Sequence, residues 1–196
     1  MFSIKPMLAA FAFSLGTVAV YAPIATAQGT TVVVIDQGRI MRDSKAGKDI
    51  QAKLKGIGSS IERELKPTAD QLNTESKSIE AQTANMTPQA MRADAALKTK
   101  VETYARKAQD FNRRRQIASG ELQLTERKAW SDFYTALRPV LQEVVTEKGA
   151  QLMVDRAEAV YTDPSIDVTA LVISKMDAKT PTISVVRQKM PTQPAR

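Results

Sequence analysis

The sequence predicts a mostly helical α+β protein, in which a small β body formed by N- and C-terminal segments carries one long antiparallel helical coiled-coil hairpin. A short β-branched run lies near the start of the chain, at 31–35, and two further segments that resemble short strands lie near its end, within 151–161. Between them, apolar residues recur at spacings of three and four, which is typical of amphipathic helices. Aromatic residues make up only 5% of the chain, so we expect thin apolar seams rather than one large core.

The first 27 residues have the features of a cleaved secretion signal. Lys5 precedes an apolar run at 7–21, and small residues at 25–27 form the cleavage pattern Ala-Thr-Ala. An uncleaved membrane anchor is the alternative, but the run is shorter than the roughly 20 residues that a spanning helix needs. We therefore expect an exported, soluble mature chain that begins at Gln28.

The composition excludes several kinds of chemistry. The chain has no Cys and no His, so it cannot form disulfides, thiolate or histidine metal sites, or nucleophile–histidine catalytic pairs. Carboxylate pairs such as Glu62 with Glu64 have no metal partner or apolar pocket that would shift a pKa. We expect no catalytic residue, no metal and no cofactor, and hence no enzyme.

The chain carries a formal net charge of +7, of which the predicted signal contributes only Lys5. A surplus of this kind attracts nucleic acid, acidic lipid headgroups or acidic unfolded chains. Charge alone does not choose among these partners.

The outgoing arm of the predicted hairpin begins near residue 45. Apolar and small residues at 50–72 recur every three or four positions, with a period that favours an almost straight seam. Pro67 lies inside this run, where a proline removes one helical hydrogen bond, so we expect a kink. Thr87-Pro88 can cap and open a helix, which places the turn of the hairpin just before it.

The returning arm is predicted to end at residue 148, so that the whole hairpin occupies 45–148. Its seam, from Leu97 to Val144, has coiled-coil spacing with Arg115 at one seam position. Arg138-Pro139 marks a second expected kink, and Gly149 is a natural helix stop.

The predicted body combines residues 28–44 with residues 149–177. The first part holds a strand and a short helix capped by Asp36; the second holds two short strands, at 151–155 and 157–161, and a last helix opened by Asp163-Pro164. A unit this small buries little apolar surface, so we expect self-association. The residues assigned to the body core or its interface are Val33, Ile35, Leu152, Val154 and Val160. Residues 178–196 contain three prolines and no acidic residue, which predicts a disordered basic tail.

These parts occur in an order that resembles the Skp (OmpH-like) family of periplasmic chaperones. The motifs are Val33-Val34-Ile35-Asp36, the segment Ala-Arg-Lys-Ala-Gln-Asp-Phe at 105–111, Leu152-Met153-Val154-Asp155, Ala159-Val160-Tyr161 and residues 166–169. The resemblance implies a periplasmic homotrimer whose hairpins enclose a cavity for unfolded outer-membrane proteins, which it holds without ATP. Pro67 and the tail after Met176 depart from the pattern.

Candidate client contacts lie on the returning arm and near the hairpin turn. Residues 90–130 hold 10 Lys and Arg against 5 Asp and Glu. The resemblance implies that this surface attracts acidic client segments or lipopolysaccharide phosphates, or an anionic membrane; a solvated face of mixed charge is an equal alternative. Methionine adapts to varied apolar surfaces, although it can equally pack one arm on the other. The candidates are Arg106, Lys107, Arg113, Arg114, Arg115, Met86 and Met91.

Two other functions remain open at this stage. An envelope-tethering coiled coil would have a rigid closed hairpin and one fixed partner. A histone-like nucleic-acid binder would use the basic charge, but export would remove its access to the chromosome, so we expect no nucleic acid in vivo.

Overall fold

The computed structural model describes residues 29–190, and the predicted signal at 1–27 lies outside them. The protein is mostly helical with one small two-stranded sheet, which confirms that part of the predicted fold class. In chain order the elements are β1 (Val32–Ile35), α1 (Gln37–Asp43), α2 (Lys45–Thr83), α3 (Pro88–Ala93), α4 (Ala95–Lys148), β2 (Leu152–Asp155), η1 (Arg156–Glu158), η2 (Pro164–Ile166) and α5 (Thr169–Lys179).

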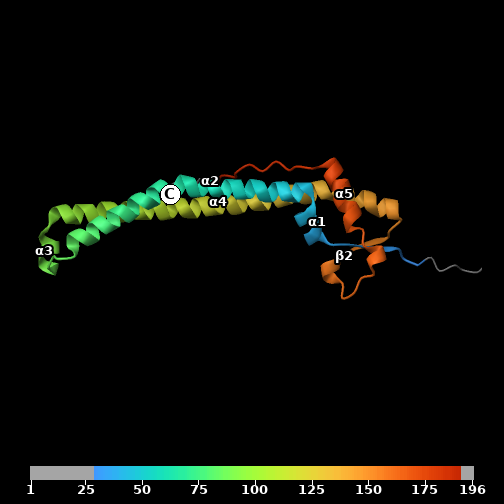
Figure 1. Ribbon diagram of the computed structural model, residues 1–196, viewed down its shortest axis with the longest axis horizontal. Helices are drawn as coiled ribbons and strands as arrows, with labels where there is room; N and C mark the ends of the chain where they lie inside the picture. Colours follow the sequence, from blue (N-terminus) through green and yellow to red (C-terminus); the bar gives the residue numbers. More distant parts are fainter. Residues whose placement is uncertain (1–28, 191–196) are drawn as a thin grey trace, which may run out of the picture.

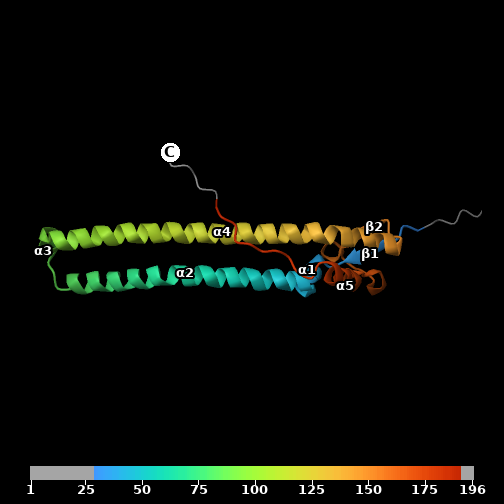
Figure 2. The same cartoon turned by 90° about the horizontal axis from the view of Figure 1, so that it is seen from above.

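Helices α2 and α4 lie side by side along the molecule, with the short α3 at the end farthest from the sheet (Figures 1 and 2). They run in opposite directions, since Lys107 pairs with Glu75 at 2.6 Å and Lys100 donates to Ser78 at 2.9 Å. The expected break is present: the hydroxyl of Thr87 accepts the N–H of Ala90, and a proline occupies the first helical position.

Neither internal proline ends its helix. Pro67 lies within α2 and Pro139 lies within α4, and both helices continue beyond them. Both prolines are exposed, so water can satisfy the carbonyl that each proline leaves without a helical donor. In contrast, Gly149 stops α4 as expected, in the left-handed conformation with φ 59°, which an L side chain rarely adopts.

The body brings together the chain segments that precede and follow the hairpin. Strands β1 and β2 pair in parallel, with Val33 opposite Met153, so the whole hairpin is the crossover between them. Parallel strands need a long connection of this kind. The core beside this sheet contains Phe133, which packs edge-on against Trp130 with ring centroids 5.6 Å apart. Other buried members are Val33, Ile35, Ile40, Ile50, Leu137, Val140, Val144, Val172 and Met176.

The predicted strand at 157–161 is wrong. Asp155 ends β2, and its carboxylate accepts the N–H of Ala157, which turns the chain into η1. The other edge of β1 is already engaged, because Val34 bridges to Asp167 and its carbonyl accepts the N–H of Val168. No position beside β1 is therefore left for a third strand.

The last helix also begins later than expected. Asp163-Pro164 opens only the single turn η2, and α5 starts at Thr169. The side chain of Asp167 accepts the N–H of Thr169 and fixes that start.

Residues 180–190 follow α5 as an extended segment that returns along the hairpin (red in Figures 1 and 2), and we call them the strap. This placement contradicts the expected disorder for residues 178–190, because α5 continues to Lys179 and Ile183 is only 8% exposed. Residues 191–196 lie outside the described chain. The composition of the tail indicated disorder. In the structure, however, apolar side chains of the strap pack on a surface that exists only in the folded protein.

Candidate functional site

The end of the hairpin that carries α3 has an open apolar depression of about 450 Å³. Met91 lines it together with Val101, which is 42% exposed, and with the buried Leu97. Met86 lies in the turn before α3, where its N–H donates to the carbonyl of Thr83. Both predicted methionines therefore lie near the hairpin turn and are half-buried. Only Met91 contributes to the depression.

The predicted basic residues lie along the exposed part of α4, but they differ in their partners. Lys107 bridges to Glu75 on α2 at 2.6 Å, and this ion pair is the first cause of the lowered pKa of Glu75. Arg113 pairs with Asp110, one turn earlier on its own helix, at 3.3 Å. The charge of each is thus partly neutralised before any ligand arrives.

Three of the predicted cations have no carboxylate within ion-pair distance among the described residues: Arg106, Arg114 and Arg115. Arg115 extends over the ring of Phe111, with its guanidinium carbon 5.9 Å from the ring centroid. Arg114 lines a shallow depression of about 230 Å³ beside the same ring. These cations are exposed and available to an anionic ligand.

The predicted body residues fall into two groups. Val33 and Ile35 are buried in the core of the single chain. Leu152 is 50% exposed, and Val160 is 107% exposed although both are apolar. Beside Val160, Tyr161 is 81% exposed, and Val154 is half-buried. The body thus leaves apolar side chains at its surface without partners in this chain.

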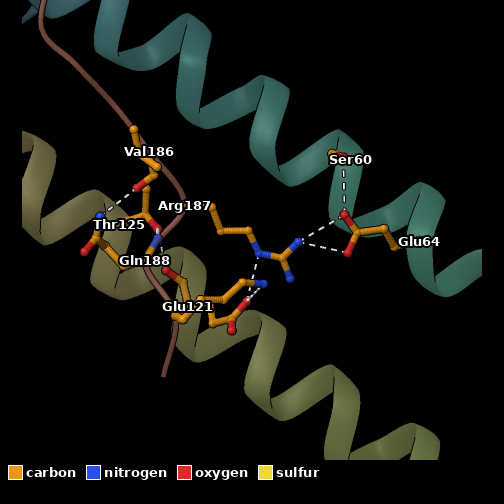
Figure 3. A network of polar contacts seen from close by, with 8 residues as sticks. Ser60, Glu64, Glu121, Thr125, Val186, Arg187 and Gln188 are labelled. Atoms are coloured by element: carbon orange, nitrogen blue, oxygen red, sulfur yellow. Dashed lines mark hydrogen bonds and ion pairs between the residues drawn. The ribbon is translucent and has the colours of Figure 1, made fainter. Parts of the chain in front are cut away.

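The strap makes a polar network with both arms of the hairpin (Figure 3). The guanidinium of Arg187 lies between them, donating through Nε to Glu121 on α4 at 2.8 Å and through Nη1 to Glu64 on α2 at 2.8 and 3.0 Å. The side chain of Glu121 is only 6% exposed, and Lys189 approaches it at 3.5 Å. Hydrogen bonds from Arg187 lower the pKa of Glu64, and the pKa of Arg187 is correspondingly raised.

The backbone of the strap is held at two points. Asp49 on α2 accepts the N–H of Ile183 at 3.0 Å, while Lys53 donates to the carbonyl of Ile183 at 2.7 Å. Burial raises the pKa of Asp49, but the hydrogen bonds from Lys53 and Ile183 outweigh it, so its pKa is below the usual value. Farther along, the hydroxyl of Thr125 accepts the N–H of Gln188 at 2.8 Å. We call these contacting residues of α2 and α4 the strap-binding surface: Asp49, Lys53, Glu64, Glu121 and Thr125.

Sequence reasoning missed this surface entirely. One signal was present in the tail, where Ile183, Val185 and Arg187 alternate with residues that turn out to be exposed or less buried. Such a period of two is typical of an extended segment with one face covered. This alternation was not recognised, because the composition of the tail predicted disorder.

Metal sites and membrane-spanning helices are both absent from residues 29–190, which the structure describes. No group of acidic side chains there could hold a metal ion. No helix there is both long enough and apolar enough to cross a membrane.

Comparison with known proteins identifies the family. The family model described as outer membrane protein (OmpH-like) matches residues 31–176, which is most of the chain. The chain belongs to the OmpH-like family. This assignment confirms the resemblance, and the strap lies beyond the residues that the OmpH-like model matches. No protein with curated function matches the chain significantly.

A solved OmpH-like structure has the same fold. It is a candidate outer membrane chaperone from Caulobacter crescentus CB15, 26% identical to this chain, with a TM-score of 0.71. The similarity covers 84% of this chain and 94% of the other. The comparison therefore extends over both the body and the hairpin.

Proposed function

We propose that this protein is a periplasmic holdase chaperone, which binds unfolded outer-membrane proteins in a cavity between the hairpins of a homotrimer and needs no ATP. The observation that carries the proposal is a hairpin of two long, mostly polar helices projecting from a body too small to cover its own apolar residues. Membership of the OmpH-like family supports the same function.

The exposed apolar residues of the body support self-association. Leu152 is the first residue of β2, and Val160 and Tyr161 lie in the irregular segment after η1; all three side chains are exposed. Burying apolar surface contributes about 25 cal/mol per Å², so a second and third copy that cover these side chains would stabilise the assembly.

The hairpin supports binding by many weak contacts. Its cations Arg106, Arg114 and Arg115 can attract acidic client segments at long range, because exposed charges raise encounter rates. Once a client is near, half-buried apolar side chains such as Met91 supply short-range contact. Binding of this kind needs no chemical step, consistent with a chain that lacks Cys and His.

The same cations make lipopolysaccharide phosphates or an anionic membrane surface a second ligand. The protein should therefore bind vesicles that contain anionic lipid, and this binding should weaken as salt screens the charges. Vesicles of neutral lipid serve as the control and should not bind.

Native mass measurement of the mature protein tests the assembly, first alone and then with a urea-unfolded outer-membrane β-barrel protein. We expect a trimer, and one client per trimer. Val160→Asp should shift the mass toward the monomer, since it places a charge in the apolar contact, whereas Gln89→Asp at the hairpin turn adds the same charge away from the body. A monomer at all concentrations would overturn the trimer.

Client aggregation without nucleotide tests the activity. The protein should keep the diluted client soluble, and Arg114→Glu with Arg115→Glu should slow its capture. Normal aggregation of the client would overturn the proposed function. A pull-down that recovers one fixed folded partner instead of unfolded clients would favour the tethering coiled coil.

A further inference from the structure

We infer that the strap-binding surface is a binding site for an extended polypeptide segment, that the strap is its built-in occupant, and that a segment of an unfolded outer-membrane protein displaces the strap. This inference rests on the proposed function, because it names where and how such a client is held.

The surface binds backbone rather than a particular side chain at both ends. Asp49 accepts the backbone N–H of Ile183 at 3.0 Å, and Lys53 donates to the backbone carbonyl of the same residue at 2.7 Å. Thr125 accepts the backbone N–H of Gln188 at 2.8 Å. Main-chain hydrogen bonds supply affinity for any extended chain, whatever its sequence.

The side chains of the strap show which segments fit. Ile183 is buried, Val185 is packed partly against the core, and Arg187 points between the arms, while Val186 is 66% exposed. A segment with alternate apolar residues therefore places one face on the surface. Transmembrane strands of outer-membrane barrels have this alternation.

The buried carboxylate of Glu121 adds a preference for a cation. Its side chain is 6% exposed, and Arg187 and Lys189 both contact it. A buried charge without a partner is costly, so an occupant that brings Arg or Lys to this point is favoured over one that does not. The surface thus favours an extended, alternating segment that carries a basic residue.

The strap is suited to be a displaceable occupant. It follows α5 directly, and a short tether of this kind gives an effective concentration on the order of millimolar. Several of its polar contacts are partly exposed, including the ion pair to Glu64, whose side chain is 54% exposed. A short peptide would compete poorly, but a long unfolded chain that already contacts the hairpin elsewhere can compete at a similar effective concentration.

Hydrogen exchange on the full-length protein tests the displacement directly. The amides of Ile183 and Gln188 should exchange slowly in the protein alone, because each donates to a side chain of the hairpin. Addition of a urea-unfolded outer-membrane β-barrel protein should accelerate their exchange by about tenfold or more, as local opening exposes them. The amide of Val172, in the buried part of α5, should stay unchanged.

A strap variant tests the competition by affinity. Arg187→Glu leaves the strap-binding surface intact but repels the strap from Glu64 and Glu121. The same client should then bind at least about threefold more tightly, because the strap occupies the strap-binding surface for a smaller fraction of the time. Arg138→Glu makes the same charge change at an exposed site of α4 outside the network and should leave client affinity unchanged.

The outcomes separate this inference from the function on which it rests. If the client binds while both strap amides stay protected, and Arg187→Glu binds no tighter than Arg138→Glu, the inference is wrong and the holdase proposal stands. If the client does not bind the wild-type protein at all, the proposed function fails and the inference fails with it. Faster exchange of both amides together with tighter binding supports the inference.

Discussion

The backbone N–H of Asp36 donates a hydrogen bond to the hydroxyl of Thr169 at 2.8 Å, across 133 positions of sequence. This contact joins the end of β1 to the first residue of α5, and Thr169 is fully buried. It lies where Val34 also bridges to Asp167. The body is therefore closed by bonds between the first and last parts of the family match.

Thr169→Val tests the value of that bond. Valine keeps the shape of threonine but removes the hydroxyl, so the partly buried N–H of Asp36 loses its acceptor. We expect the free energy of unfolding to fall by about 1–3 kcal/mol. Thr146→Val, which removes an exposed hydroxyl bonded only within α4, should cost far less. Equal losses in chemical unfolding would contradict a special role for the Asp36 contact.

Gly47 allows α1 and α2 to meet closely. A Cβ at Gly47 would lie 1.8 Å from the carbonyl oxygen of Met41, which is a backbone atom that cannot move aside cheaply. We therefore expect Gly47→Ala to lower the midpoint of thermal unfolding. Gly56→Ala, in open space on the same helix, should raise stability by about 0.5–1 kcal/mol, as alanine is the better helix former. A stabilising Gly47→Ala would show that this junction is looser than described.

Phe133 is the largest fully buried side chain of the body core. It makes edge-on contacts with the rings of Trp130 and Tyr134, at centroid distances of 5.6 and 5.9 Å. Phe133→Ala should reduce the free energy of unfolding by about 3–5 kcal/mol through lost burial and a residual cavity. Ile117→Ala, at a side chain that is 41% exposed, is the control and should cost much less. Denaturant unfolding of the two variants measures the difference.

The contact between α4 and α5 should depend on pH. Lys175 and Lys179 donate to the carboxylate of Glu143 and lower its pKa from 4.5 to about 2. Since the pKa is lower in the folded state, the contact stabilises the fold fully above about pH 4.5 and is lost as pH falls toward 2. Glu143→Gln should therefore be less stable than wild type at pH 7, with a difference that shrinks through this window.

Thermal unfolding of both proteins from pH 7 to pH 2 measures this effect. Glu126→Gln removes an exposed carboxylate from the same helix and is the matched control. A difference between wild type and Glu143→Gln that stayed constant across the range would rule out the ion pair as its cause.

The sequence was sufficient for features that depend on local chemistry. Thr87-Pro88 opens a helix, because the threonine side chain caps it and the proline ring fixes φ. Gly149 ends a helix, because glycine adopts the left-handed conformation. These effects act only on neighbouring residues of the chain. The motifs that carry the family resemblance were also readable. The third strand was not correctly predicted, because Asp155 turns the chain out of β2 into η1 before it reaches Val160-Tyr161.

By itself, the sequence determined the helical arms, the strand at 32–35, the family and the absence of Cys and His chemistry. Only the tertiary structure decided where the tail lies. In the sequence, Arg187 is one basic residue in a proline-containing segment. In the structure, its guanidinium pairs with two carboxylates, those of Glu64 and Glu121. These carboxylates are far apart in sequence and come together because α2 and α4 pack side by side, which no local pattern in the tail encodes.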